Sequence, residues 1–272
     1  PVVVNLHGSG FVLQTMGDDA LFCQRVADGI NGIVVDVDYA KAPELPFPHA
    51  NLDIDAVMSW LQDRDQKDAA SKETIPVSKA FEVDGHQTPL RIDTGKVALT
   101  GFSSGGNLAL TACVRAKQRD ELDKIAAVAS FYPSTNLSES PWKKPNVKPE
   151  SGASGGVLPP PLRNFFYSCY VPTDKQTGKD PTYPLRSSSV ISPLYANADE
   201  FPQSVSIITC SGDSLAREGR QMAEHIVAGH GVVWWEAKGQ GHAWDKLTKP
   251  GSEPEKLKEE AYELVIGRLR SA

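Results

Sequence analysis

A serine in a glycine-rich turn is the strongest chemical signal in the sequence. Ser103 lies in Gly101-Phe-Ser103-Ser-Gly105, between an apolar strand-like run and a helix-like run. A serine at such a strand–turn–helix junction is exposed and strained, and the flanking glycines let the turn form without Cβ clashes. The helix N-terminus directs free N–H groups at the site, which favours a developing negative charge. The pattern predicts a nucleophilic serine; the alternative is a glycine-rich structural turn.

A nucleophilic serine needs a base, and the sequence offers six histidines. His242, in Gly239-Gln-Gly241-His242, follows the last predicted strand and should open on the same edge of the sheet as Ser103. We therefore expect His242 to be the base; the alternative is a loop histidine that contacts Trp244. The remaining histidines fit surface, capping or loop-shaping roles better: His7, His49, His86, His225 and His230.

The base in turn needs a carboxylate that orients it. Asp213 directly follows the predicted strand 205–210, so it reaches the same edge of the sheet. The chain order serine, acid, histidine is one of those that such triads use. Asp213 could instead cap the next helix, and Glu218 is the nearest rival acid.

A second glycine-rich turn follows the first predicted strand. In His7-Gly8-Ser9-Gly10-Phe11, small residues allow backbone N–H groups to approach a tetrahedral oxyanion. We expect donors from Gly8, Ser9 and Gly10, joined by the N–H of Ser104. A simple strand-ending turn is the alternative.

Short apolar runs alternate with longer helical patterns along the chain. The runs lack the alternation of half-exposed strands, which is typical of a parallel sheet covered on both faces. Ile54, Val57, Met58 and Leu61 share one helical face, and a second such pattern follows Pro254. These features predict an α/β fold: a mostly parallel sheet with helices on both faces. The expected strands are 2–6, 33–37, 96–100, 125–131, 205–210 and 232–235.

Two segments interrupt this alternation within a single domain spanning 1–272. Residues 63–92 form a polar insertion, with a hairpin expected around Asp84-Gly85. Residues 134–190 are rich in Pro, Ser, Lys and Gly but enclose an aromatic group at 165–170. A loop of this length inside a compact domain suggests a lid, so we expect 134–190 to be a lid or cap insertion.

Composition excludes several classes of protein. Lys and Arg total 28 against 34 Asp and Glu, so the net charge of −6 argues against nucleic-acid binding. No apolar run approaches the ~20 residues of a membrane-spanning helix. The four cysteines have no CxxC spacing, and HExxH and phosphate-binding loops are absent, so we expect no metal or organic cofactor. The neighbouring acids at 36, 38, 53 and 55 fit solvated carboxylates better than a metal site.

Together the motifs resemble those of the hormone-sensitive-lipase-like carboxylesterases of the α/β-hydrolase superfamily. His7-Gly-Ser-Gly10 stands where that group has His-Gly-Gly-Gly, and Gly101-Phe-Ser-Ser-Gly-Gly106 where it has Gly-Asp-Ser-Ala-Gly-Gly. Asp38-Tyr-Ala-Lys-Ala-Pro-Glu44 matches Asp-Tyr-Arg-Leu-Ala-Pro-Glu, and Asp213 and His242 fall at the acid and base positions. The resemblance covers nearly all of the chain and implies the α/β-hydrolase fold.

The resemblance also implies supporting roles and marks some departures. Tyr39 and Glu44 would organise the site without contacting the substrate. Ser9 replaces a glycine, Ala40-Lys41 replaces Arg-Leu, and Arg217 stands where an acid often follows the catalytic aspartate. The N-terminal cap and first two strands that the group usually has are missing from this chain. Because it opens on Pro1 rather than methionine, we expect something natural or experimental to precede this point. The compartment stays open, with a slight preference for the cytoplasm.

These features predict a serine carboxylesterase that acts on a small-molecule ester through an acyl-enzyme. The expected apolar pocket favours a short, medium or aromatic acyl group. The alternatives that would use the same triad are an amide, lactone or thioester hydrolase and an acyltransferase. A non-catalytic small-molecule receptor is a separate alternative. The expected substrate contacts are Phe11, Phe102, Phe165, Phe166 and Trp244.

Overall fold

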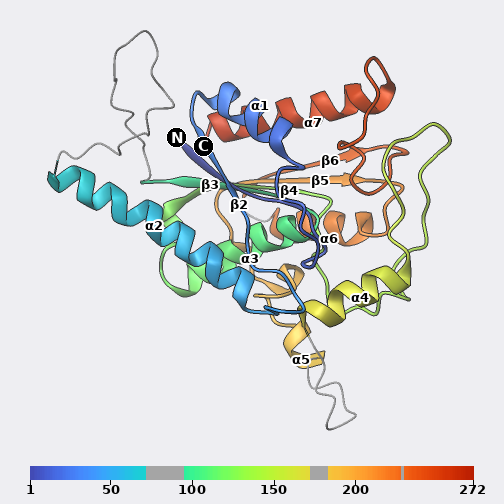
Figure 1. Cartoon of the computed structure of the whole chain (residues 1–272), viewed down its shortest axis with the longest axis horizontal. Coiled ribbons are helices and arrows are strands. Elements are labelled where there is room, and N and C mark those ends of the chain that lie inside the picture. The colour runs from blue at the N-terminus through green and yellow to red at the C-terminus, as the bar shows by residue number, and fades with distance from the viewer. Residues whose placement is uncertain (72–94, 172–182, 228–229) are drawn as a thin grey trace.

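The computed structural model describes residues 1–71, 95–171, 183–227 and 230–272 (Figure 1). In this part of the chain a six-stranded sheet has the order β2-β1-β3-β4-β5-β6, and all neighbouring strands are parallel. Helices cover both faces, so the expected α/β architecture, a parallel sheet with helices on both faces, is confirmed. The strands are β1 Val2–Leu6, β2 Ile33–Val37, β3 Val97–Phe102, β4 Ile125–Phe131, β5 Ser204–Cys210 and β6 Gly231–Ala237.

Two hydrophobic layers hold the helices against the sheet. Helices α1 (Ala20–Ile30) and α7 (Glu253–Arg270) lie together on one face. Helices α2 (His49–Ser71), α3 (Ser104–Gln118) and α6 (Ala216–Ile226) lie on the other. Side chains alternate along β1, where Val2, Val4 and Leu6 join the α3 layer and Val3 joins the α1–α7 layer. This two-residue period explains why β1 is mainly apolar: both of its faces are buried.

The predicted strands agree with the observed ones to within two residues at either end. The helical face of Ile54–Leu61 lies in α2, and Pro254 stands in the first turn of α7, as expected. Residues 63–71 of the expected polar insertion continue α2, and the hairpin around Asp84-Gly85 lies outside the described residues. None of the described helices is long and apolar enough to cross a membrane.

Residues 134–171 of the expected insertion 134–190 lie at the carboxyl ends of the strands. The insertion contains α4 (Pro160–Tyr170), α5 (Tyr183–Arg186) and an extended stretch that forms an antiparallel bridge between Gly156 and His242. The N–H of Gly156 donates to the carbonyl of His242 at 2.8 Å, and the N–H of His242 donates back at 2.9 Å. The insertion therefore supports the loop that carries the predicted base. Short 3₁₀ turns complete the elements at Leu122–Lys124, Pro193–Tyr195 and Ala198–Glu200.

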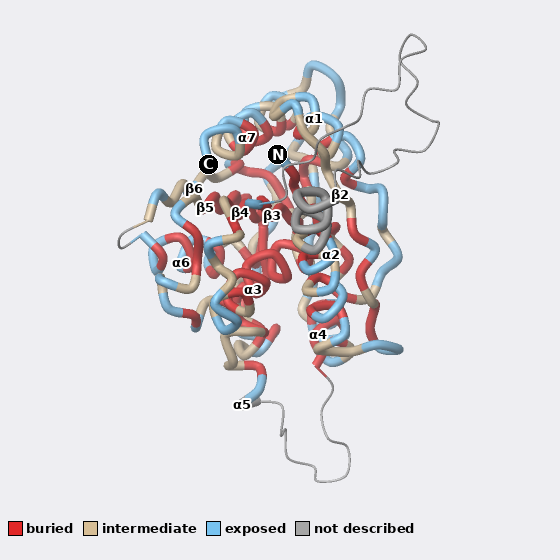
Figure 2. Tube along the Cα trace, turned by 90° about the vertical axis from the view of Figure 1, so that its left-hand side faces the viewer, coloured by how far each residue is buried: buried red, intermediate tan, exposed pale blue. Residues whose placement is uncertain are grey.

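Helix α3 is buried along almost its whole length, as Figure 2 shows, and its first turn presses against the sheet. A Cβ atom on Gly105 would overlap the carbonyl oxygen of Leu6 in β1. A Cβ atom on Gly101 would overlap the backbone of Gly105 itself. Glycine is required at both positions because another backbone approaches them closely. This contact sets where the turn that carries Ser103 lies relative to the end of β1.

We expect Gly105→Ala to destabilise the fold severely, because backbone rather than a flexible side chain blocks the new methyl group. Gly267→Ala is the matched control, since Gly267 is exposed in α7 and nothing lies within 4 Å of the place its methyl group would take. There we expect a gain of about 0.5–1 kcal/mol from helix propensity. Thermal or urea unfolding of both variants checks this; equal stability of the two would contradict the close contact.

Candidate active site

Ser103 occupies the strained turn between β3 and α3. Its φ of 52° and ψ of −114° lie outside the regions that non-glycine residues usually adopt. Its N–H donates to the carbonyl of Phe131 at the end of β4, at 2.9 Å. The hydrogen bond to β4 thus holds the serine in this conformation, in which its hydroxyl points toward His242.

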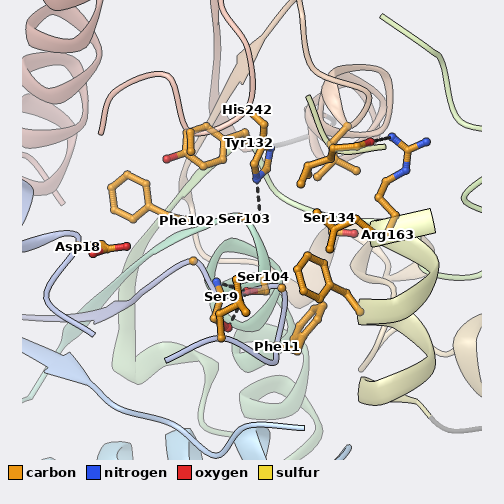
Figure 3. A pocket seen from close by; sticks show the side chains of 18 of the residues that line it. Ser9, Phe11, Asp18, Phe102, Ser103, Ser104, Tyr132, Ser134, Arg163 and His242 are labelled. Atoms are coloured by element: carbon orange, nitrogen blue, oxygen red, sulfur yellow. Dashed lines mark hydrogen bonds between the residues drawn. The ribbon is translucent and has the colours of Figure 1, made fainter. Parts of the chain in front are cut away.

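The structure brings Ser103, His242 and Asp213 into one hydrogen-bonded series. Figure 3 shows its part between Ser103 and His242. The Nδ1 atom of His242 lies 2.6 Å from Oδ2 of Asp213, and its Nε2 atom lies 2.9 Å from Oγ of Ser103. An ionised carboxylate only accepts, so Nδ1 carries the proton and Nε2 is left to accept the serine proton. The three side chains come from the ends of β3, β5 and β6, and Asp213 is 2% exposed. This arrangement can activate a hydroxyl as a nucleophile.

Neighbouring groups also hold the imidazole of His242. The ring of Tyr132 meets it edge-on at 4.9 Å between centroids, and the Tyr132 hydroxyl donates to Asp245 at 2.6 Å. Asp245 also accepts from Tyr262 and lies 2.9 Å from the Lys246 amine. Burial acts to raise the pKa of the Asp245 carboxyl, but Lys246 and the two tyrosine hydroxyls outweigh it and lower the pKa. The buried carboxylate of Asp245 thus connects the histidine loop to Tyr132, at the end of β4, and to Tyr262 in α7.

Glu218, the rival acid, has no contact with His242 and belongs to a different network. It is buried, pairs with the buried Lys144 and accepts from the N–H of Thr135 at 2.9 Å. Burial raises the pKa of Glu218, while Lys144 and the backbone donors oppose that rise. Its position shows that it fastens the start of the insertion to α6.

The turn after β1 lies beside Ser103, as expected for an oxyanion site. A Cβ atom on Gly8 would stand 3.2 Å from the carbonyl oxygen of Phe102 and 3.4 Å from Cβ of Ser103. Within the described residues, the N–H groups of Gly8, Gly10 and Ser104 have no acceptor. Ser9 differs from the expectation: its N–H already donates to Oγ of Ser104 at 2.9 Å. His7 shapes this turn, since its ring stacks on Tyr39 and Nδ1 lies 2.9 Å from Thr15 Oγ1.

A pocket of about 240 Å³ opens onto Ser103 and His242. Three of the expected substrate contacts, Phe11, Phe102 and Phe166, line it. Phe165 does not: it is 50% exposed and lies on the outer side of α4. Trp244 does not line it either, since its side chain is wholly buried and packs against Trp235, with 6.1 Å between the ring centroids. These two expectations require correction, because proximity in sequence to a catalytic loop does not decide which way a side chain points.

Sequence reasoning missed much of the pocket wall. Helix α4 contributes Leu162, Arg163, Phe166 and Tyr167, whose three- and four-residue spacing places them on one helical face. That spacing would have separated Phe166 from Phe165. Long-range contacts supply the other missed residues, for which the sequence has no local signal: Leu13, Asp18, Asp19, Tyr132, Ser134, Leu158, Leu215, Ala243 and Lys246.

Asp19 and Lys246 line one side of the pocket. The Lys246 amine is 2.6 Å from Asp19 and 2.9 Å from the buried Asp245, and it lies 3.4 Å from the centre of the Phe102 ring. Burial raises the pKa of the Asp19 carboxyl, although Lys246 and Asn5 act to lower it. No group of His, Cys, Asp and Glu in residues 1–71, 95–171, 183–227 or 230–272 is arranged to hold a metal ion.

Comparison with known proteins places the chain in a family. Residues 3–246 match the family model described as the alpha/beta hydrolase fold, and the chain belongs to that family. The resemblance to hormone-sensitive-lipase-like carboxylesterases is thereby confirmed.

Individual relatives include proteins named as esterases. The chain is 31% identical over 140 residues to Esterase LipI of Mycobacterium tuberculosis, covering 52% of this chain and 37% of LipI. It is 26% identical over 223 residues to an ethyl acetate hydrolase of Pseudomonas putida, covering 81% of this chain and 58% of that protein. An esterase structure from Pyrobaculum calidifontis superposes with a TM-score of 0.74 at 27% identity, over all of this chain and 76% of the other. The chain thus spans only part of the length of these relatives.

We expect Asp213→Asn to lose activity and Glu218→Gln to lose stability. Asp213→Asn should lower kcat about 10⁴-fold with little loss of stability, because an amide favours the wrong imidazole tautomer. Glu218→Gln should lower the free energy of unfolding by about 3–5 kcal/mol, because Lys144 is then buried without its partner. Glu139→Gln, which breaks the more exposed pair with Arg217, is the control and should cost no more than about 1 kcal/mol. Urea unfolding and ester kinetics separate the two effects; a large kcat loss in Glu218→Gln alone would overturn the assignment of the acid.

Proposed function

We propose that this chain is a serine carboxylesterase that hydrolyses small-molecule carboxylic esters. The observation that carries the proposal is the hydrogen-bonded series from Asp213 through His242 to Ser103, at 2.6 and 2.9 Å. The names of the relatives agree with it, since LipI is called an esterase and the Pseudomonas protein an ethyl acetate hydrolase.

In this proposal Ser103 attacks the ester carbonyl while Nε2 of His242 takes its proton. Asp213 stabilises the imidazolium that forms and keeps the ring oriented. The oxyanion accepts hydrogen bonds from backbone N–H groups of the turn after β1 and from that of Ser104. His242 then protonates the leaving alcohol, and an acyl-enzyme remains on Ser103. Water activated by His242 hydrolyses this acyl-enzyme and regenerates the serine.

The pocket supports a preference for short, medium or aromatic acyl groups. Its wall is mainly aromatic and aliphatic, with Phe11, Phe102 and Phe166 near the nucleophile. The α4 part of the insertion 134–190 forms one side of it, in agreement with the proposed role of this insertion as a lid. An apolar pocket stabilises an apolar acyl chain by removing its surface from water, at about 25 cal/mol per Å².

Ser103→Ala tests the nucleophile. We expect it to abolish hydrolysis of p-nitrophenyl acetate while leaving the melting temperature within a few degrees of the wild-type value, because only one hydroxyl is lost. A fluorophosphonate probe should label the wild-type protein at Ser103 and fail to label the variant, with peptide mapping as the readout. Ester turnover by the variant at the wild-type rate would reject the proposal. A parallel assay of p-nitroanilides separates esterase from amidase activity.

Two adjacent phenylalanines test the acyl pocket with a matched pair of variants. Phe166 lines the pocket, whereas Phe165 is half exposed on the outside of α4. We expect Phe166→Ala to shift the preference among p-nitrophenyl esters toward longer acyl chains, because it removes a wall of the pocket. Phe165→Ala should keep the wild-type profile of kcat/KM against chain length. The same shift in both variants would show that α4 acts through general destabilisation instead.

A further inference from the structure

Three buried hydroxyls form a compact cluster beneath the nucleophile. They belong to Ser9 in the turn after β1, to Tyr39 after β2 and to Ser104 in the first turn of α3. Oγ of Ser9 lies 2.8 Å from the Tyr39 hydroxyl and 3.3 Å from Oγ of Ser104. Each of the three residues is at most 4% exposed. Figure 3 shows Ser9 and Ser104 together on the side of the site opposite His242.

The donors in this cluster have one consistent order. The Tyr39 hydroxyl donates to the carbonyl of His7 at 2.5 Å, since a carbonyl can only accept. The Ser9 hydroxyl therefore donates to Tyr39, and the Ser104 hydroxyl is directed toward Oγ of Ser9. In this order a lone pair of Ser104 Oγ is free to accept, and the N–H of Ser9 fills it at 2.9 Å. The cluster thus holds both the hydroxyl of Ser104 and the backbone amide of Ser9.

This order bears on how many N–H groups can receive an oxyanion. The N–H groups of Gly8, Gly10 and Ser104 have no acceptor in the described part of the protein, whereas that of Ser9 is committed to a side chain. We infer that the Ser104 hydroxyl is a positioning group that withholds the Ser9 amide, so that the oxyanion donors come from the other three N–H groups. The inference deepens the proposed esterase function and rests on it.

Ser104 then acts on the rate through Ser9. A hydrogen bond that the Ser9 amide makes equally in the free enzyme and in the transition state does not accelerate the reaction. Removing the hydroxyl leaves that amide buried without an acceptor, so it can turn to the oxyanion as negative charge develops. Oxyanion donors typically change kcat about 100- to 1,000-fold. Because this amide must first reorient, we expect a smaller gain in Ser104→Ala, of about tenfold.

The test compares Ser104→Ala with the wild-type protein on p-nitrophenyl acetate. We expect kcat to rise about tenfold with KM unchanged, and affinity for a trifluoromethyl ketone, which forms a tetrahedral adduct, to rise in parallel. Ser104→Thr keeps a hydroxyl and should not show the gain. Ser130→Ala is the matched control: it removes another buried seryl hydroxyl, in β4, that has no partner in the described protein. It should leave kcat and ketone affinity unchanged.

A second measurement uses the wild-type protein and does not depend on how the variants fold. In amide NMR spectra, formation of the ketone adduct should move proton signals among Gly8, Gly10 and Ser104 downfield and leave that of Ser9 in place. A downfield shift of the Ser9 signal, or an unchanged or lower kcat in Ser104→Ala, would overturn the inference. These results differ from failure of the proposed function, in which the wild-type protein neither hydrolyses esters nor reacts with a fluorophosphonate at Ser103.

Discussion

The approach of the first turn of α3 to β1 is the contact on which the site depends. Gly105 lies so close to the carbonyl of Leu6 that no side chain fits between them. This contact brings the turn that carries Ser103 against the end of β1, where the His7–Phe11 turn begins. The serine hydroxyl and the backbone donors therefore share one location because two backbones touch, and the side chains of the site act within that arrangement.

The remaining part of the site comes from elements that are distant in the chain. The insertion pairs with the histidine loop through the Gly156–His242 bridge, and α4 closes the pocket from the side opposite Phe102. Phe166 also stands against Gly10, where a Cβ atom would overlap its ring. One aromatic side chain thus bounds the pocket and packs on the turn after β1. A change at Phe166 therefore alters both the pocket wall and a contact of that turn.

Much of this organisation could be predicted from the sequence. The strands were predictable because the inner ones are buried on both faces, so their residues are mainly apolar, and the turns at Ser103 and His7 because glycine is needed where backbones meet. Ser103, Asp213 and His242 were predictable because each lies in the turn or loop after a strand of a parallel sheet. The orientation of Phe165 and Trp244 was not, since packing of α4 and of the β6 layer decides it. The hydrogen bond from Ser9 to Ser104 joins residues 95 positions apart, and no local pattern indicates it.

The network around Lys246 connects β1 to α7. Asn5 in β1 donates to Asp19, which pairs with Lys246, and Asp245 joins Lys246 to Tyr262 in α7. The loop that holds His242 is thus anchored on one side by the first strand and on the other by the last helix. During synthesis, a polypeptide emerging from the ribosome can form the serine turn long before α7 leaves the exit tunnel. The imidazole gains this support only after α7 has been synthesised, so a nascent chain that ends before α7 still lacks one of the two anchors of the histidine loop.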